Sequence, residues 1–314
     1  MAFDSASGYN NLPSGNFAPE IFSQKVLKFF RRASVIEDIT NTDYAGEIEN
    51  FGDTVKIIKE PTVTVSSYQR GSVVNPQDLA DDQISMVVDN ANAFAFKIDD
   101  IEERQSHVNF EALATSSGAY SLKRKYDGNI LTAMFDGAGL SSESGAATAT
   151  VSGLGTLGSP LTSQTGDNLV NIMLKMARAL DDQSVPEENR WFAPAFYETL
   201  FGAGAKFAEV QVTGDASSPL RNGLVAQGNI AGFACYKSTA MNASGTDTVD
   251  VTGLGAGEFP ILAGHMSSTA TASHIAKTEV VRSTETFSDI VRGLHVFGRK
   301  VMRPEALVRS VISL

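Results

Sequence analysis

A long ribbon of two alternating segments, within residues 51–98, constrains the fold of this chain more than any other feature. Apolar side chains recur at every second position, as in β-strands with one buried face: Val55, Ile57, Val63 and Val65 on the outgoing strand, and Ile84, Met86, Val88, Phe94, Phe96 and Ile98 on the returning one. A polar tip at residues 66–71 and a polar stretch at 78–83 separate the two. An isolated hairpin is marginally stable in water. We therefore expect the ribbon to lie on another surface, namely a neighbouring copy of the chain.

The composition indicates a globular, acidic protein. The 314 residues are 42% hydrophobic, and no apolar run is long enough to predict a membrane span. The net charge of −11 argues against generic nucleic-acid binding, which needs clustered basic residues. A negatively charged wall nevertheless suits a container for DNA, because the wall repels phosphate and lets the DNA slide as it enters. Cys235 is the single cysteine, which fits a reducing cytosol, and we expect it to be a small buried apolar side chain.

Helices are predicted on both sides of the ribbon. Residues 1–20 are rich in Ser, Asn, Gly and Pro and should be irregular, whereas 19–33 form a basic amphipathic helix that we expect to dock on protein. Residues 99–135 predict one long helix, because acidic residues crowd its start and Lys123, Arg124 and Lys125 lie near its end. That helix would span about 55 Å, with a bend expected at Gly118 or Gly128.

The second half of the chain predicts a mixed body. Residues 137–165 are rich in Gly, Ser, Thr and Ala and indicate a loop or insertion. A helix is expected over residues 165–180, with an apolar face of Leu169, Ile172, Met173, Met176 and Leu180. A short helix is predicted over 194–201, and strands over 190–192, 229–238, 259–263 and, in several pieces, 279–314.

The sequence holds no pattern that predicts catalysis, a metal site or a cofactor. Residues 153–158 (GLGTLG) match a dinucleotide-binding motif literally, but they lack the strand before and the helix after that the mechanism needs. The four histidines have no metal-ligand spacing. The paired carboxylates at 99–100 and 181–182 fall at helix ends, where dipole and solvent explain them better than acid–base catalysis. We therefore expect a protein that is not an enzyme.

The order of the parts resembles the major capsid proteins of tailed phages, with the Hong Kong 97-type fold. The stretches that carry the resemblance are 51–55 (FGDTV), 94–102 (FAFKIDDIE), Trp191 with Pro194 and Leu200, 228–233 (GNIAGF), 287–294 (FSDIVRGL) and 298–308 (GRKVMRPEALV). The resemblance implies an α+β chain: an N-terminal arm and short helix (1–45), an extended loop (46–98), a peripheral domain with a spine helix (99–165 and 268–314) and an axial domain (166–267).

The resemblance also implies partners. Hexamers and pentamers would build an icosahedral shell around double-stranded DNA, in a virion assembled in the bacterial cytoplasm, with a portal and in some cases a decoration protein. The chain starts too near the arm for an internal scaffolding segment, so a separate scaffold protein is expected. Inter-subunit contacts are predicted at Lys56, Lys59, Tyr68, Arg70, Arg31 and Arg32. No partner for a covalent crosslink can be assigned to the ribbon lysines, so none is expected.

Other classes of protein remain open at this point. A nanocompartment shell of the same fold, enclosing an enzyme rather than DNA, differs little in sequence. The Gly/Thr-rich stretches suggest a phage decoration protein or adhesin, which would form trimers instead of shells. An enzyme with an unrecognised site is the last alternative.

Overall fold

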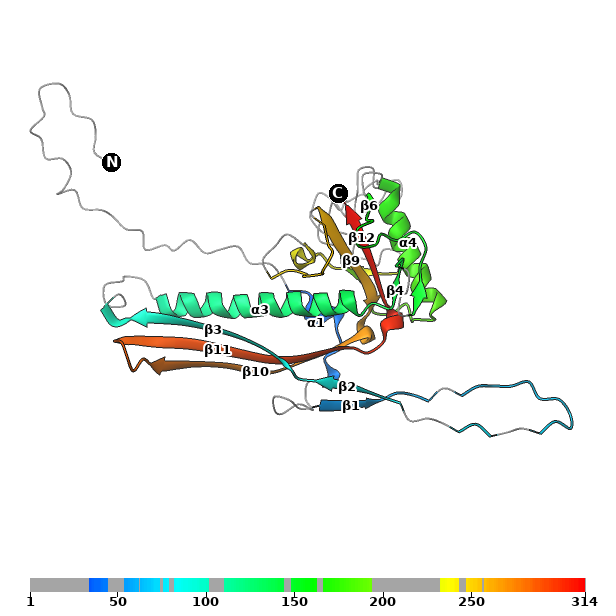
Figure 1. Cartoon of the computed structure of the whole chain (residues 1–314), viewed down its shortest axis with the longest axis horizontal. Coiled ribbons are helices and arrows are strands. Elements are labelled where there is room, and N and C mark those ends of the chain that lie inside the picture. The colour runs from blue at the N-terminus through cyan, green and yellow to red at the C-terminus, as the bar shows by residue number, and fades with distance from the viewer. Residues whose placement is uncertain are drawn as a thin grey trace, which may run out of the picture.

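The computed structural model describes residues 34–44, 54–61, 63–73, 76–78, 82–101, 110–143, 148–162, 166–193, 232–242, 247–255 and 257–313. A rod made of one long helix above a three-stranded sheet continues at one end into a second, larger sheet (Figure 1). A narrow hairpin projects past this larger body, and the short helix α1 (Ile36–Ile39) lies beside the rod (Figure 1). The predicted tail and helix within residues 1–33, and the predicted helix 194–201, lie outside the described residues.

The hairpin is built from β1 (Thr54–Ile58) and β2 (Gln83–Val87), which pair antiparallel with Val55 opposite Met86. The predicted alternation is confirmed there, since Val55 and Met86 are buried while Lys56 and Ser85 are exposed. The assignment of residues 94–98 to the same hairpin is wrong. They belong to β3 (Asn90–Asp99), which turns away and pairs with β11 (Ser288–Val301). Alternation fits either pairing, so the local pattern could not choose between them.

The rod packs helix α3 (Phe110–Asp136) on an antiparallel sheet of order β10-β11-β3, with β10 spanning Thr269–Arg282. Phe94 of β3 lies between Gly118 of α3 and Gly293 of β11, where a Cβ on Gly118 would be 2.8 Å from the ring. Glycine at both positions lets the helix approach the sheet closely. At the other side of the sheet β10 is an edge strand, bridged to Asn41 at Ala270.

The long helix differs from its prediction at the start. Asp99 is the last residue of β3 rather than the first of a helix; helical geometry begins at Asp100, and residues 102–109 lie outside the described part. The predicted end is confirmed within one residue, at Asp136. The helix is uninterrupted through Gly118 and Gly128, so neither position breaks it. A Cβ at Gly128 would lie 2.8 Å from the Asp247 carbonyl oxygen, which explains the glycine by close packing.

The larger body is a seven-stranded sheet of order β5-β4-β12-β9-β7-β8, with β6 also paired to β12. Its strands are β4 (Leu140–Ser141), β5 (Ala149–Thr150), β6 (Leu161–Thr162), β7 (Arg190–Ala193), β8 (Ala234–Cys235), β9 (Glu258–His265) and β12 (Leu307–Ser313). Helix α4 (Gly166–Asp182) buries Ile172, Met173, Met176 and Leu180 against this sheet. Three single turns of 3-10 helix, Thr239–Met241, Met266–Ser268 and Pro304–Ala306, connect the strands.

Most predicted elements of this body are confirmed: α4, β7, β9 and β12. The loop expected over residues 137–165 is wrong in part, because β4, β5 and β6 come from it and pair with β12 or with one another. Of the strand predicted over 229–238, only Ala234–Cys235 is a strand among the described residues. The pieces predicted within 279–302 are the end of β10 and one continuous β11. The larger sheet also takes strands from both the predicted peripheral and axial segments.

Candidate assembly interface

The base of the hairpin is anchored in its own chain. Val55, Met86 and Val88 form an apolar cluster with residues of the rod sheet and the chain after it: Ala270, Ala272, Val296 and Met302. Met86 and Val88 are completely buried. Burying such side chains contributes roughly 1.5–3 kcal/mol each relative to leaving them exposed. The base of the ribbon is therefore packed in an apolar core that the rod sheet of the same subunit helps to form.

An ion pair closes the paired part of the hairpin. Lys59 Nζ lies 3.2 Å from Asp82 Oδ2, and the Lys59 backbone N–H donates to the Asp82 carbonyl at 2.9 Å. Further out, the two arms are joined by the Thr64 N–H donating to Gln77 Oε1 at 3.0 Å. None of the described residues between Glu60 and Asp78 is assigned to a strand. The predicted strand pairing at Val63 and Val65 is therefore wrong, although the chain there is extended.

The end of the hairpin is a turn at Arg70 and Gly71. The Ser72 N–H donates to the Gln69 carbonyl at 2.9 Å, and Gly71 has a φ of +92°, a left-handed conformation that favours glycine. A Cβ at Gly71 would meet nothing within 4 Å. The turn therefore requires glycine for its backbone geometry, not for packing within this subunit.

Apolar side chains gather on the projecting part of the hairpin, where the described part of their own chain leaves them exposed. Val65 is 92% exposed, and three further apolar side chains are 63–86% exposed: Val63, Tyr68 and Val73. The hairpin end lies far from both sheets (Figure 1). Scattered apolar side chains on a surface are ordinary, but several gathered on one narrow projection mark a surface that another molecule covers.

The predicted contact residues fall into separate places. Tyr68 and Arg70 lie together at the exposed end of the hairpin, as predicted from its polar tip. Lys56 is exposed on β1 at the base, and Lys59 is paired with Asp82 within the same chain. Arg31 and Arg32 lie outside the described residues.

Sequence reasoning missed the apolar members of the hairpin surface. Val63 and Val65 are predicted as part of the alternating ribbon that lies on a neighbouring copy, but neither they nor Val73 are among the predicted contact residues. The missed signal was the absence of a matching alternation on the return arm, since residues 73–82 hold no apolar repeat opposite Val63 and Val65.

A second exposed apolar surface lies at the far end of the rod, at the turn between β10 and β11. Phe287 is 81% exposed, and the Asp100 N–H donates to its carbonyl at 3.2 Å, which brings Ile101 to the same end. Arg282 holds this end together through ion pairs with Asp100 and Asp289. The molecule thus presents exposed apolar groups at two remote points.

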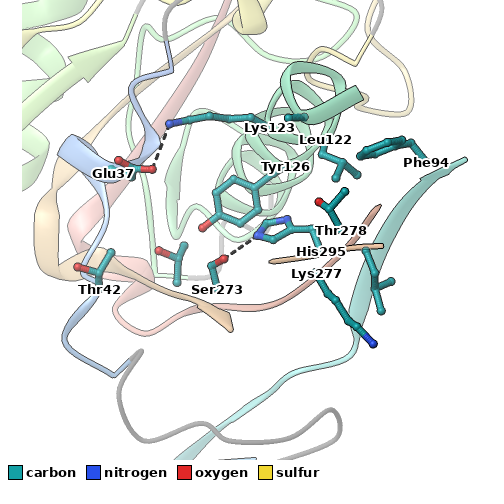
Figure 2. Close-up of a pocket in the computed structure, with 13 residues that line it drawn as sticks. Glu37, Thr42, Phe94, Leu122, Lys123, Tyr126, Ser273, Lys277, Thr278 and His295 are labelled. Atoms are coloured by element: carbon teal, nitrogen blue, oxygen red, sulfur yellow. Dashed lines mark hydrogen bonds and ion pairs between the residues drawn. The ribbon is translucent and has the colours of Figure 1, made fainter. Parts of the chain in front are cut away.

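A cavity of about 530 Å³ opens between α3 and the rod sheet (Figure 2). Phe94, Leu122 and Leu294 give it apolar walls, and Tyr126 and His295 face it from α3 and β11. Lys123 and Glu37 pair across its rim at 3.2 Å. Among the described residues, neither this cavity nor any other place gathers three or more His, Cys, Asp or Glu side chains that could hold a metal ion.

The paired carboxylates noted in the sequence are engaged in ion pairs within the subunit. Asp100 pairs with Arg282, Asp181 with the buried Arg190 at 2.8 Å, and Asp182 with Arg178. Residues 153–158 form a loop that packs Gly155 against the backbone of Val311, not a strand-to-helix turn. Burial raises the pKa of the Cys235 thiol to about 11, so the thiol stays neutral; the side chain is partly buried rather than fully so. No helix of the described residues is long and apolar enough to cross a membrane.

Comparison with solved structures places this fold among phage capsid chains. A chain from Mycobacterium phage Che8 matches with a TM-score of 0.74 and 24% identity over 94% of this chain and 97% of that one. A chain of the capsid of cyanophage P-SCSP1u matches with a TM-score of 0.67 and 16% identity over 96% and 94%. A chain of the mature capsid of bacteriophage PhiM1 gives 0.67 and 14% over 94% and 91%. No protein-family model matches the sequence, and no curated protein matches it significantly. The chain therefore has an α+β fold shared with capsid chains along nearly its whole length.

Proposed function

We propose that this protein is a major capsid protein that self-assembles into the icosahedral shell of a tailed phage. The observation that carries the proposal is the hairpin: its base is packed in its own subunit, while its end exposes apolar side chains that the described part of the subunit leaves uncovered. An adjacent subunit is the simplest surface to cover them. The match to capsid chains over more than nine-tenths of both sequences supports the same role.

The finer arrangement follows from that role. The extended loop consists of β1, β2 and the residues between them. The peripheral domain comprises α3 and the rod sheet, with β3 added to it, and the axial domain comprises α4 and the larger sheet, with β4, β5, β6 and β12 added. These domain bounds differ from the ones expected at 98, 165 and 268, because all strands of one sheet are taken to belong to one domain. The Hong Kong 97-type fold is the architecture we assign.

The partners follow from shell assembly. Copies of the chain form hexamers and pentamers, and many weak contacts suffice because each subunit is held at several points. Double-stranded DNA is enclosed without sequence-specific binding, which agrees with the net charge of −11. A portal, a separate scaffold protein and in some shells a decoration protein complete the virion, which is assembled in the bacterial cytoplasm. The subunit acts through interface area and is not an enzyme.

The two alternatives receive less support. Decoration proteins and adhesins attach to a finished shell, whereas the structures that share this fold are capsid chains. A nanocompartment shell would use the same contacts but enclose a protein cargo. The phage origin of the similar structures favours DNA as the content.

The hairpin provides the test. Residues 64–77 are replaced by a short Gly-Ser turn that keeps β1, β2 and the Lys59–Asp82 pair. We expect a soluble subunit with the thermal unfolding midpoint of the wild type, because the described residues among those removed lie outside its core. Electron microscopy should find no closed particles, whereas the wild type forms them. Normal shells from the shortened chain would refute the role of the hairpin.

A matched control separates loss of the hairpin surface from loss of any exposed apolar group. Leu174 on α4 is 52% exposed and lies away from the hairpin. The Leu174→Ser variant should assemble as the wild type does. Equal loss of particles in this control would remove the special role we assign to the hairpin end.

A further inference from the structure

His295 lies at the centre of the contact between α3 and the rod sheet. Its ring is edge-on to Tyr126 of α3, with centroids 5.1 Å apart, and stacks on Phe297 at 5.4 Å. Its Nε2 is 2.6 Å from the Ser273 hydroxyl of β10 (Figure 2). One side chain thus joins the helix, the strand that carries it and the edge strand.

The other ring nitrogen has no partner. Nδ1 of His295 is buried and makes no hydrogen bond. Asn92 lies directly opposite on β3, and its Nδ2 is likewise buried without a hydrogen-bond partner. Side chains opposite each other on antiparallel strands have Cβ atoms about 5 Å apart. The ring proton therefore belongs on Nε2, donated to Ser273, because a proton on Nδ1 would be a buried donor without an acceptor.

A β-bulge supports this arrangement. The register between β10 and β11 shifts between Ser273 and Ile275, next to the strand position of His295. A bulge changes the direction of the side chains beside it. Here it accompanies the 2.6 Å hydrogen bond between Ser273 on the edge strand and the His295 ring under α3, and both residues also line the cavity of about 530 Å³.

We propose that His295 is a proton-sensitive catch that holds α3 on the rod sheet while its ring is neutral and loosens that contact when Nδ1 takes up a proton. The imidazolium would place a second N–H, and a positive charge, among Tyr126, Phe297 and Asn92. None of these three offers a charge that compensates it. The inference concerns the subunit itself and does not depend on the proposed shell function.

The charged groups around the ring are already engaged. On α3, Lys123 pairs with Glu37 of α1, and the Asp127 carboxylate accepts from the Ser34 hydroxyl at 2.8 Å. On β10, Lys277 pairs with Glu279 at 3.2 Å. Burial keeps the Tyr126 phenol neutral by raising its pKa to about 12, and β3 contributes the uncharged Asn92. None of these groups therefore directs an anion at Nδ1.

The sign of the pH dependence follows from burial. Desolvation lowers the pKa of His295 below the ordinary imidazole value. The packed joint therefore binds fewer protons than the opened one, so its stability is complete above about pH 6.5 and is lost as the pH falls toward the lower folded-state value. Each unit of difference between the two pKa values makes the opened joint about tenfold more populated at acid pH.

Hydrogen exchange of the purified full-length chain tests the catch. Amide protection of α3 is measured at about pH 7.5 and about pH 5, on either side of the ordinary imidazole pKa, and corrected for the intrinsic pH dependence of exchange. We expect the protection of α3 to fall several-fold at acid pH in the wild type. His295→Gln, whose amide can still donate to Ser273 but cannot take up a proton, should lose that change. An unchanged acid response in this variant would overturn the proposal.

Two further variants keep the test decisive if His295→Gln folds poorly. Asn92→Asp places a carboxylate opposite Nδ1, which favours the imidazolium, so the acid response of α3 should vanish or reverse. A full wild-type response in Asn92→Asp would also contradict the catch. His265 is the matched control: it is a half-buried histidine whose Nδ1 accepts from the Ser267 N–H at 3.1 Å in the other sheet. His265→Gln should leave the response of α3 intact, and loss of that response would overturn the assignment to His295.

Discussion

The base and the end of the hairpin belong to the same ribbon but differ in the burial of their apolar side chains. At the base, Met86 faces the apolar cluster of its own subunit and is completely buried. At the end, Val65 has the same alternating position and is almost fully exposed. The contrast teaches that a β-ribbon pattern specifies which side chains share a face, not which molecule covers that face.

The largest effect on the isolated subunit is expected at the base. Met86→Ala leaves a cavity beneath the hairpin and should lower the free energy of unfolding by about 2–5 kcal/mol. Urea unfolding followed by circular dichroism measures the change. Val87→Ala, on the adjacent and partly exposed side chain of β2, is the control and should cost less than about 1 kcal/mol. Similar losses in the two variants would show that the base is not anchored as described.

A smaller effect is expected where the paired strands end. Lys59→Ala removes the ion pair with Asp82, whose side chains are about half and two-thirds exposed, and should cost about 0.2–1 kcal/mol. Added salt should reduce the difference between this variant and the wild type, since exposed charges are screened. Lys56→Ala, at an exposed lysine of β1, serves as the control with little change. A salt-independent loss at Lys59 would mean that its role is packing.

The smallest effect on the subunit is expected at the end of the hairpin. The triple variant Val63→Ser, Val65→Ser, Val73→Ser should change the free energy of unfolding by no more than about 0.5 kcal/mol per site, because exposed side chains contribute little to a monomer. Its loss should appear only in particle formation, measured by light scattering and electron microscopy. A variant that unfolds easily, or one that assembles normally, would erase the distinction between base and end.

The elements with strong periodicity could be predicted from the sequence. The apolar face of α4, the four buried residues of β7 and the run in β12 each define an element without knowledge of its neighbours. The two-residue strands β4 and β5 could not be predicted, since two residues carry no period. β4 pairs with β12 from the distant C-terminal chain, and β5 pairs in turn with β4. The partner of β3 was likewise undetermined, because Phe94 and Phe96 alternate equally well beside β1 or β11.

The exposed end of the hairpin could be predicted from the sequence, whereas contacts of its residues with another subunit stay a prediction. The polar tip drew attention to Tyr68 and Arg70, and both are exposed there. The apolar residues beside them became interface candidates only once the structure placed no part of the described chain against them. His295 was considered only as a metal ligand, since a sequence cannot tell which ring nitrogen will lack a partner after strands and helix meet.

The edge strand β10 has a consequence for how a free subunit meets other copies of the chain. Its outer edge is bonded to Asn41 only around Thr269 and Thr271 among the described residues, and the rest of the strand continues to Arg282 beyond that bridge. Such an edge can recruit strands from other molecules, and charged side chains are a common defence. Lys277, Glu279 and Arg282 place that defence along the outer half of β10. We therefore expect this half of the β10 edge to resist pairing with a strand from another copy of the chain.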